Sequence, residues 1–265
     1  MAESVTAVLL VGGLGTRLRS VLPTTPKAIA LVGGESFLDL LLRQLRCQGI
    51  RHIVMCTGYL AEQIESHFGD GRAWDVMIEY SREPEALGTA GAIKRAEKYL
   101  QGFPDFVVMN GDSFLETDFN ELVRFHRGHK GLVSIAVWRA QNAARYGIVK
   151  VDVHNRVNSF AEKSGNESPG LINAGVYVFS HGVIEHIPEP PASLERDVFP
   201  QLVGHGIYAL EHRGSFIDIG TPEDYVRVQP LWELLNSAAI RRHHFRSDQE
   251  KDNLLVRSEL IGGEE

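Results

Sequence analysis

Residues 6–28 read TAVLLVGGLGTRLRSVLPTTPKA, and this stretch carries the strongest structural signal in the chain. Its first six residues form an apolar, partly β-branched run that predicts a buried strand, and glycines follow at positions 12, 13 and 15. Successive backbone N–H groups in a glycine-rich turn can cradle an anion, and Arg17 and Lys27 add fixed positive charge beside it. A turn without a ligand does not explain both cations. The stretch therefore predicts a binding site for an anionic ligand at the end of the first strand.

Two common glycine motifs do not fit this turn. A P-loop needs Gly-Lys-Ser/Thr after four spacer residues, and a dinucleotide-binding fingerprint needs a third glycine where this chain has Leu18. The second predicted strand also ends in CTGY, residues 56–59, instead of in the acidic residue that would hold a ribose. A nicotinamide-dependent oxidoreductase is therefore disfavoured.

The first half of the chain alternates β-branched runs with amphipathic segments. The pattern predicts strands at residues 6–11, 53–56, 76–80, 106–110 and 132–137, and helices at 37–48, 61–68, 89–100 and 119–126. Strands that alternate with helices form a mostly parallel sheet with crossover connections. We therefore expect an α/β fold with a Rossmann-like, mostly parallel mixed sheet flanked by helices.

The second half, from Gly147 onward, contains shorter strands and tight turns, which predicts a β-rich subregion on the same sheet. The expected features are a hairpin turn at 153–156, strands at 172–179 and 216–219, a surface loop at 185–193, and a last helix that begins after Thr221. We expect residues 1–236 to form one catalytic domain. Residues 237–265 are charged and lose periodicity, which predicts an extension that is mobile or contacts another subunit.

Composition excludes several classes of protein. The chain has 265 residues, a hydrophobic share of 43% and a net charge of -7, which suits a globular enzyme and argues against a nucleic-acid binder with its basic footprint. The two cysteines, Cys47 and Cys56, lie in apolar patterns and suggest core thiols in a reducing compartment. The sequence shows no apolar run of membrane-spanning length and no basic N-terminal leader. We expect a cytoplasmic protein without nucleic-acid or membrane partners.

Two aspartates stand at the ends of buried runs. Asp112 follows FVVMNG and Asp218 follows FI, so each is expected near the carboxyl end of a strand, where open α/β sheets bind ligands. Two hard carboxylates suit a Mg²⁺ ion that keeps several waters and bridges phosphate oxygens. Taken singly, each aspartate is more often a turn or cap residue, so the pattern alone leaves both interpretations open.

An ordered set of short motifs carries a family resemblance. The chain resembles the sugar-1-phosphate nucleotidyltransferases, whose signature G-G-x-G-T-R-L followed by P-K is present here as residues 12–18 and 26–27. The further matches, in the family's order, are LGTAG at 87–91, NGDS at 110–113, FAEK at 160–163, NAG at 173–175 and FIDIGTP at 216–222. The resemblance covers roughly residues 5–228. A single short motif of this kind can occur by chance in an unrelated protein, but six motifs in the family's order are highly specific for the family.

The resemblance implies a reaction and assigns roles. A sugar 1-phosphate attacks a nucleoside triphosphate, pyrophosphate leaves, and a nucleotide-sugar is formed with Mg²⁺ as cofactor. The implied catalytic residues are Arg17, Lys27 and Asp112. The implied nucleotide-binding residues are Leu10, Gly12, Gly13, Gly15, Thr16, Arg17, Gly88 and Asp112. The implied sugar-phosphate residues are Gly147, Glu162, Lys163 and Asn173, and the implied metal ligands are Asp112 and Asp218.

The motifs indicate the type of reaction more specifically than they indicate the base and the sugar of the substrates. The segments TRLRSV, GYLAEQIESHFGDG and LGTAGAI are most similar to the D-glycero-α-D-manno-heptose 1-phosphate guanylyltransferase branch, which implies GTP and GDP-heptose for surface polysaccharide synthesis. Mannose-1-phosphate guanylyltransferase or another sugar-1-phosphate enzyme is the alternative, because EKS replaces the EKP of many relatives and the P-L-T run is missing. A non-catalytic nucleotide-sugar sensor is expected to lack one of the two cations or one of the two aspartates. This chain has both Arg17 and Lys27 and both Asp112 and Asp218. Whether the chain forms a homo-oligomer stays open.

Overall fold

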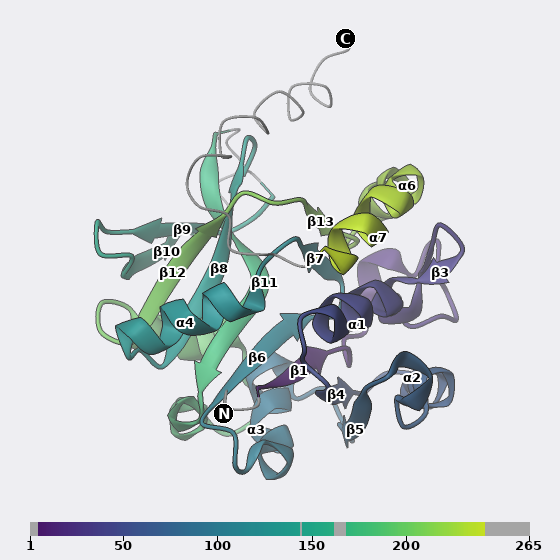
Figure 1. Cartoon of the computed structure of the whole chain (residues 1–265), viewed down its shortest axis with the longest axis horizontal. Coiled ribbons are helices and arrows are strands. Elements are labelled where there is room, and N and C mark those ends of the chain that lie inside the picture. Colours follow the sequence, from purple (N-terminus) through teal and green to yellow (C-terminus); the bar gives the residue numbers. More distant parts are fainter. Residues whose placement is uncertain (1–4, 144, 162–167, 242–265) are drawn as a thin grey trace.

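A nine-stranded mixed sheet forms the centre of the computed structural model, which describes residues 5–143, 145–161 and 168–241 (Figure 1). Its strands are β1 (Thr6–Leu10), β4 (His52–Thr57), β5 (Met77–Arg82), β6 (Asp105–Asn110), β8 (Val133–Ala140), β9 (Ile148–Val151), β10 (Val157–Ala161), β11 (Gly170–Ser180) and β12 (Ile207–His212). Two small ladders stand apart from it. They pair β2 (Leu31–Val32) with β3 (Glu35–Ser36), and β7 (Ser113–Leu115) with β13 (Phe216–Asp218).

The N-terminal half of the sheet is parallel, as the alternating pattern predicts. Its order is β5-β4-β1-β6, and Thr6 of β1 is in register with His52 of β4 on one side and with Phe106 of β6 on the other. The core residues Ala7, Val8 and Leu9 of β1 are fully buried, which is what a central strand covered on both faces requires. All predicted strands of this half exist, with bounds that differ by one to three residues.

The C-terminal half of the sheet is more antiparallel than the alternation suggests. Strand β8 does not lie beside β6, because β11 lies between them and is antiparallel to both. Strand β12, which the sequence did not reveal, extends the sheet parallel to β8. The predicted β-rich subregion is confirmed, since β9 and β10 pair with each other and continue the same sheet. A tight turn joins them, in which the Asp152 carboxylate accepts the backbone N–H groups of His154 and Arg156.

Helices cover both faces of the sheet. They are α1 (Phe37–Cys47), α2 (Ala61–Phe68), α3 (Gly88–Leu100), α4 (Phe119–His129), α5 (Phe199–Leu202), α6 (Pro222–Val228) and α7 (Trp232–Ile240). Helices α1, α2, α4 and α7 contribute to one hydrophobic core, and α3 and α5 to the other core across the sheet (Figure 1). The start of α6 is as predicted, because the Thr221 hydroxyl accepts the Asp224 N–H as a helix cap.

Two stretches differ from their sequence interpretations. The proline-rich loop at 185–193 is not simply a surface loop, because Ala192 is buried and its carbonyl accepts the N–H groups of Ala90 and Gly91 in α3. Helix α7 crosses the domain boundary expected at residue 236 and ends at Ile240. The predicted extension beyond residue 241 lies outside the described residues. Within the described part of the chain, none of the helices has the length and apolar character needed to cross a membrane.

A buried histidine of α4 connects that helix to strands β8 and β11. His126 of α4 is 1% exposed; its Nδ1 lies 2.9 Å from the Ser134 hydroxyl of β8, and its Nε2 lies 2.8 Å from the Ser180 hydroxyl of β11. Asp105 of β6 stands 3.6 Å from the same Nε2 atom. Since both ring nitrogens have hydroxyl partners, the ring is held in place as a structural connection between the helix and the sheet.

This histidine makes stability depend on pH. Burial lowers the pKa of His126 from 6.5 to about 4, Asp105 opposes that change, and Arg127 and His129 reinforce it. Between pH 6.5 and pH 4, His126 binds a proton in the unfolded chain but stays neutral in the folded protein. We therefore expect the free energy of unfolding to decrease by about 3 kcal/mol as the pH falls towards 4. Urea unfolding across this range should show a flatter pH dependence for His126→Gln. Exposed His186→Gln is the control, and an unchanged slope in His126→Gln would contradict the assignment.

Candidate active site

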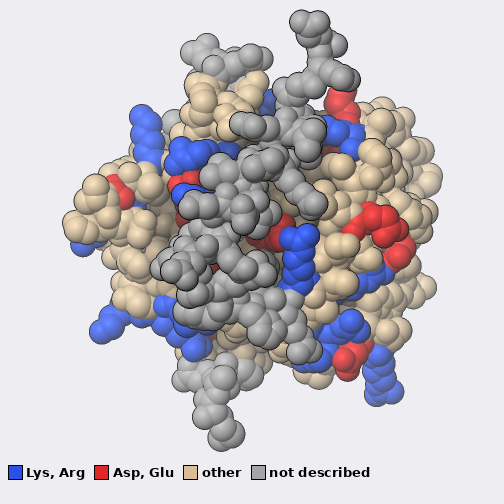
Figure 2. All heavy atoms as spheres, turned by 45° about the horizontal axis from the view of Figure 1, so that its top comes forward, with Lys and Arg blue, Asp and Glu red and all other residues tan. Residues whose placement is uncertain are grey.

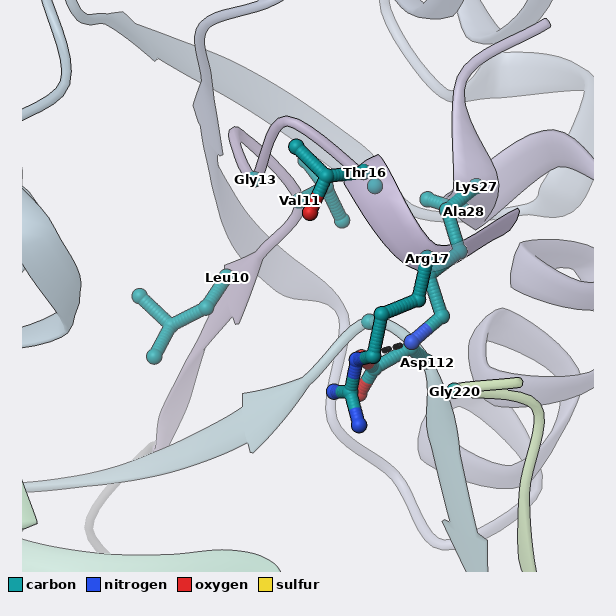
Figure 3. Close-up of a pocket in the computed structure, with 11 residues that line it drawn as sticks. Leu10, Val11, Gly13, Thr16, Arg17, Lys27, Ala28, Asp112 and Gly220 are labelled. Atoms are coloured by element: carbon teal, nitrogen blue, oxygen red, sulfur yellow. Dashed lines mark hydrogen bonds and ion pairs between the residues drawn. The ribbon is translucent and has the colours of Figure 1, made fainter. Parts of the chain in front are cut away.

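The glycine-rich loop opens onto a cavity of about 170 Å³ at the carboxyl end of β1. Figure 3 shows its lining, in which the Arg17 side chain extends beside Lys27 towards Asp112. The lining residues are Leu10, Val11, Gly13, Gly15, Thr16, Arg17, Lys27, Ala28, Gly111, Asp112 and Gly220. The structure therefore brings together most of the residues that the first motif predicts for a nucleotide, and it adds Asp112 from the other side.

The loop needs glycine at two positions for different reasons. Gly15 has φ +58° and precedes the short 3₁₀ turn Thr16–Leu18, so it occupies the left-handed region that side chains disfavour. Gly12 does not line the cavity. A Cβ atom there would lie 2.5 Å from Oε1 of Glu83 and 3.1 Å from the Gly58 nitrogen, so glycine is needed for close packing against the ends of β4 and β5.

The paired aspartates meet through the small β7–β13 ladder. Asp112 directly precedes β7, and Asp218, the last residue of β13, is in register with Ser113. The backbone N–H of Ile219 donates to the carbonyl of Asp112 at 3.0 Å, which fixes the two segments side by side. The sequence alone placed each aspartate at a strand end. The ladder brings the two into one site.

Lys27 lines the cavity and lies beside this acidic pair. Its ammonium contacts the Asp112 carboxylate, and its side chain is only 12% exposed, whereas that of Asp112 is 35% exposed. A Cβ atom built on Gly220 would lie 3.5 Å from the ammonium and 2.5 Å from Asp218 Oδ1, so all three charged groups are close neighbours. Burial, and then the Asp112 charge, raise the pKa of Asp218, while Lys27 opposes the rise.

The acidic pair fits a hard divalent cation. Two carboxylates that repel each other gain when a cation lies between them, and oxygen donors match the preference of Mg²⁺, which usually keeps waters and takes one or two carboxylates. The described residues contain no group of three or more His, Cys, Asp or Glu side chains that would form an all-protein metal cage. The donor set thus suits a metal shared with a phosphorylated ligand.

Two of the sequence-predicted sugar residues, Asn173 and Gly147, lie outside the lining of this cavity. Asn173 of β11 donates from Nδ2 to the Tyr177 hydroxyl at 2.8 Å, and its Oδ1 accepts the Gly175 N–H at 2.9 Å. Gly147 is exposed and precedes β9. Neither Asn173 nor Gly147 lines the described cavity. Two further candidates, Glu162 and Lys163, lie outside the described residues.

Gly88 also lies away from the cavity lining. It begins α3 with φ +76°, and a Cβ atom there would lie 2.4 Å from the Ala192 carbonyl oxygen. Its glycine is therefore required by backbone packing at the helix start. This packing does not assign Gly88 a ligand, so its role against the base stays a prediction from the resemblance.

Sequence reasoning missed Glu83. It follows β5, its backbone N–H donates to the Thr57 carbonyl at 2.7 Å, and its Oε2 accepts the Leu87 N–H at 3.0 Å. Burial raises the pKa of Glu83, and the Leu87 hydrogen bond acts against the rise. The only signal in the sequence was a carboxylate four residues before the LGTAG motif at 87–91. Its closeness to Gly12 results from the packing of parallel strands that are far apart in the sequence.

Comparison with known proteins agrees with this geometry. Residues 6–233 match the family described as Nucleotidyl transferase. The chain is 39% identical over 229 residues to mannose-1-phosphate guanylyltransferase of Mycobacterium tuberculosis, covering 85% of this chain and 64% of that protein. It is 35% identical over 223 residues to mannose-1-phosphate guanylyltransferase catalytic subunit beta of Drosophila pseudoobscura pseudoobscura, covering 83% and 60%. The chain thus spans less than two thirds of the length of these curated relatives.

Two solved structures are also similar. The crystal structure of HddC from Yersinia pseudotuberculosis superposes with a TM-score of 0.78 at 34% identity, and covers 86% of this chain and 99% of that one. HddC complexed with GMP-PN gives a TM-score of 0.77 at the same 34% identity. Because the family match runs from the first strand into the last helix, the chain belongs to the nucleotidyl transferase family.

Proposed function

We propose that this chain is a sugar-1-phosphate guanylyltransferase, with residues 1–236 as its catalytic domain. A phosphate oxygen of the sugar 1-phosphate attacks the α-phosphorus of GTP, the bond between the α- and β-phosphates breaks, and pyrophosphate leaves. The observation that carries the proposal is the contact of Lys27 with Asp112 beside Asp218, at the mouth of a glycine-rich anion cradle.

The charges explain why no general base is needed. A phosphate monoester has a second pKa around 6, so its oxygen is already largely deprotonated near neutrality. The protein must position two anions and neutralise their charge. We assign Arg17, Lys27 and the loop N–H groups to the triphosphate and the departing pyrophosphate. Gly147 and Asn173, together with Glu162 and Lys163 by the family resemblance, are assigned to the sugar phosphate.

Asp112 and Asp218 are the proposed ligands of Mg²⁺, which would polarise the α-phosphoryl oxygens when bound. The two carboxylates would then fix where the reacting phosphorus lies relative to Lys27. This assignment is supported by the closeness of the two carboxylates: the Ile219 N–H donates to the Asp112 carbonyl, and the Asp112 charge adds to the effect of burial in raising the pKa of Asp218. Chelation of divalent ions should abolish pyrophosphate release.

Guanine as the base is supported by two observations. One similar protein is named mannose-1-phosphate guanylyltransferase, and the similar protein HddC was crystallised in complex with GMP-PN. In addition, the half-buried Glu83 carboxylate lies against Gly12, whose chain neighbours Val11 and Gly13 both line the cavity. A carboxylate accepts both N–H donors on the Watson–Crick edge of guanine, whereas adenine offers one donor and one acceptor there.

Glu83→Gln should therefore change base preference. An amide matches adenine and loses one acceptor for guanine, so we expect kcat/KM for GTP to fall about 10- to 100-fold relative to ATP. Steady-state kinetics with each nucleotide measure the ratio. The exposed neighbour Glu85→Gln is the matched control. An unchanged GTP-to-ATP ratio in Glu83→Gln would remove Glu83 from the base site.

For the sugar, we propose D-glycero-α-D-manno-heptose 1-phosphate, with GDP-heptose as a precursor of surface polysaccharide. The support is the resemblance of the segments at 16–21 and 58–71 to that branch. Mannose 1-phosphate is the second candidate, favoured by the names of the curated relatives. We also propose a cytoplasmic location, supported by the free thiols of Cys47 and Cys56.

One experiment tests the proposal. The purified chain is incubated with each of the common nucleoside triphosphates and with several sugar 1-phosphates, with and without Mg²⁺ and chelator, and pyrophosphate is measured. We expect release only with a metal, GTP and a manno-configured sugar 1-phosphate. Binding of a nucleotide-sugar without any turnover would favour the non-catalytic sensor instead.

A further inference from the structure

A bidentate arginine–aspartate pair, the Arg145–Asp224 fork, joins a loop to the first turn of helix α6 near the acidic pair. Arg145 belongs to the loop before β9, and both terminal nitrogens of its guanidinium reach Asp224 in the first turn of α6. Nη1 donates to Oδ1 at 3.2 Å, Nη2 contacts Oδ2, and Nη2 lies 3.4 Å from the Thr221 hydroxyl. Bidentate arginine–carboxylate pairs fix orientation as well as distance. The fork therefore holds the 145–147 loop against the start of α6.

The carboxylate in this fork is unusually enclosed. The Asp224 side chain is 3% exposed, and Arg227 contacts it as well, at 3.1 Å. Burial acts to raise the pKa of Asp224, but hydrogen bonds from Arg145 and Thr221 outweigh it and leave the pKa lowered. The Asp224 hydrogen bond is also the first cause of the raised pKa of Arg145. A buried carboxylate held this way has little freedom to move.

The fork stands between two segments with proposed roles. On the Arg145 side, Tyr146 and then Gly147 follow directly. On the Asp224 side, the chain leads back through Thr221 to Asp218 within six residues. Tyr146 also connects the segments, because it lies beside Phe216, which stands two residues before Asp218. Its ring packs against Phe216 of β13 with the centroids 6.1 Å apart. Figure 1 shows β13 leading towards α6.

We infer that the Arg145–Asp224 pair is a positioning clamp, which sets the Gly147 loop relative to the Asp218 carboxylate. The inference rests on the proposed function, in which Gly147 faces the sugar phosphate and Asp218 holds the metal. The clamp acts at the junction of these two groups. Neither Arg145 nor Asp224 lines the cavity that we assign to the triphosphate, so GTP should respond to the clamp only through the metal.

The test compares Arg145→Met, which removes the fork, with Arg145→Lys, which keeps the charge. We expect Arg145→Met to raise the KM for sugar 1-phosphate and the dissociation constant for Mn²⁺ alone, measured by calorimetry, about tenfold each, because residues that orient ligand-bearing segments carry such effects. With Mg²⁺ kept at saturation, the KM for GTP should stay within about twofold. Arg145→Lys should recover part of the loss.

The control is a second fork of the same chemistry. Arg139 of β8 pairs with Glu211 of β12 through two hydrogen bonds of 2.9 Å, away from the cavity lining. Arg139→Met should leave all three constants unchanged. A lower melting temperature of Arg145→Met with unchanged constants, or an equal rise in both KM values, would overturn the clamp. If Arg145→Met does not fold, the same comparison is made with Arg145→Lys, which must then show the sugar-selective rise.

Pyrophosphate release by the wild-type chain distinguishes failure of the proposed function from failure of the Arg145–Asp224 clamp. If it releases no pyrophosphate with any sugar 1-phosphate, the proposed function fails, whatever the variants do. If the wild type is active and the Arg145 variants match the Arg139 control, only the clamp fails.

Discussion

We expect Lys27→Met to lower pyrophosphate release about 10²- to 10³-fold, because the ammonium that contacts Asp112 is the cation that we assign to the triphosphate and the leaving pyrophosphate. Loss of one preorganised charge-stabilising group in a site of this kind has this typical size. Single-turnover kinetics with saturating GTP measure the effect on the chemical step.

The same change should leave the fold largely intact. Asp112 keeps 35% of its side chain exposed, so water can solvate the carboxylate after Lys27 is removed, and we expect the melting temperature to move by only a few degrees. Lys98→Met, on the exposed side of α3, is the matched control and should affect neither rate nor melting temperature. If Lys27→Met lost activity only in proportion to folded protein, the lysine would have a structural role.

Asp218→Asn should separate activity from stability more sharply. The pKa of Asp218 is raised in the folded protein, so at pH values above it the charged carboxylate destabilises the fold, and stability increases as the pH falls through that pKa. An uncharged amide removes this repulsion. We expect an equal or higher melting temperature near neutral pH, together with a loss of activity of about 10³-fold, since Asp218 is one of the two proposed metal ligands.

Two measurements check this expectation. Differential scanning calorimetry from pH 5 to 8 compares the wild type with Asp218→Asn, and calorimetric titration with Mn²⁺ compares their metal affinity. Glu97→Gln, an exposed carboxylate on α3, serves as the control for loss of one negative charge. A variant that is less stable than the wild type at pH 8 while it binds Mn²⁺ normally would show that Asp218 supports the fold and not a metal.

The sequence predicted those parts of the structure that depend on local chemistry. The strand leading into Gly12, the cap at Thr221 and the aspartates at the strand ends all follow from nearest neighbours and periodicity, and the structure has each of them. The placement of β11 between β6 and β8 could not be predicted, because an antiparallel buried strand and a parallel one have the same apolar pattern.

The site shows the same division. Gly13, Gly15, Thr16 and Arg17 lie together in the sequence, and the structure places all four in the lining of one cavity. The approach of Glu83 to Gly12, and the Arg145–Asp224 fork, join residues about 70 to 80 positions apart through long side chains. Such contacts depend on how the strands and loops pack in three dimensions, and no sequence spacing encodes them.

The β7–β13 ladder also determines when the acidic pair can exist during synthesis. Asp112 emerges from the ribosome 106 residues before Asp218, and the backbone bond between Ile219 and Asp112 closes that long loop. Loop closure of this length has an entropic cost and must wait for the second strand. A nascent chain that ends before residue 218 therefore cannot assemble the paired carboxylates. Metal-dependent chemistry would begin only after nearly the whole described chain has been made.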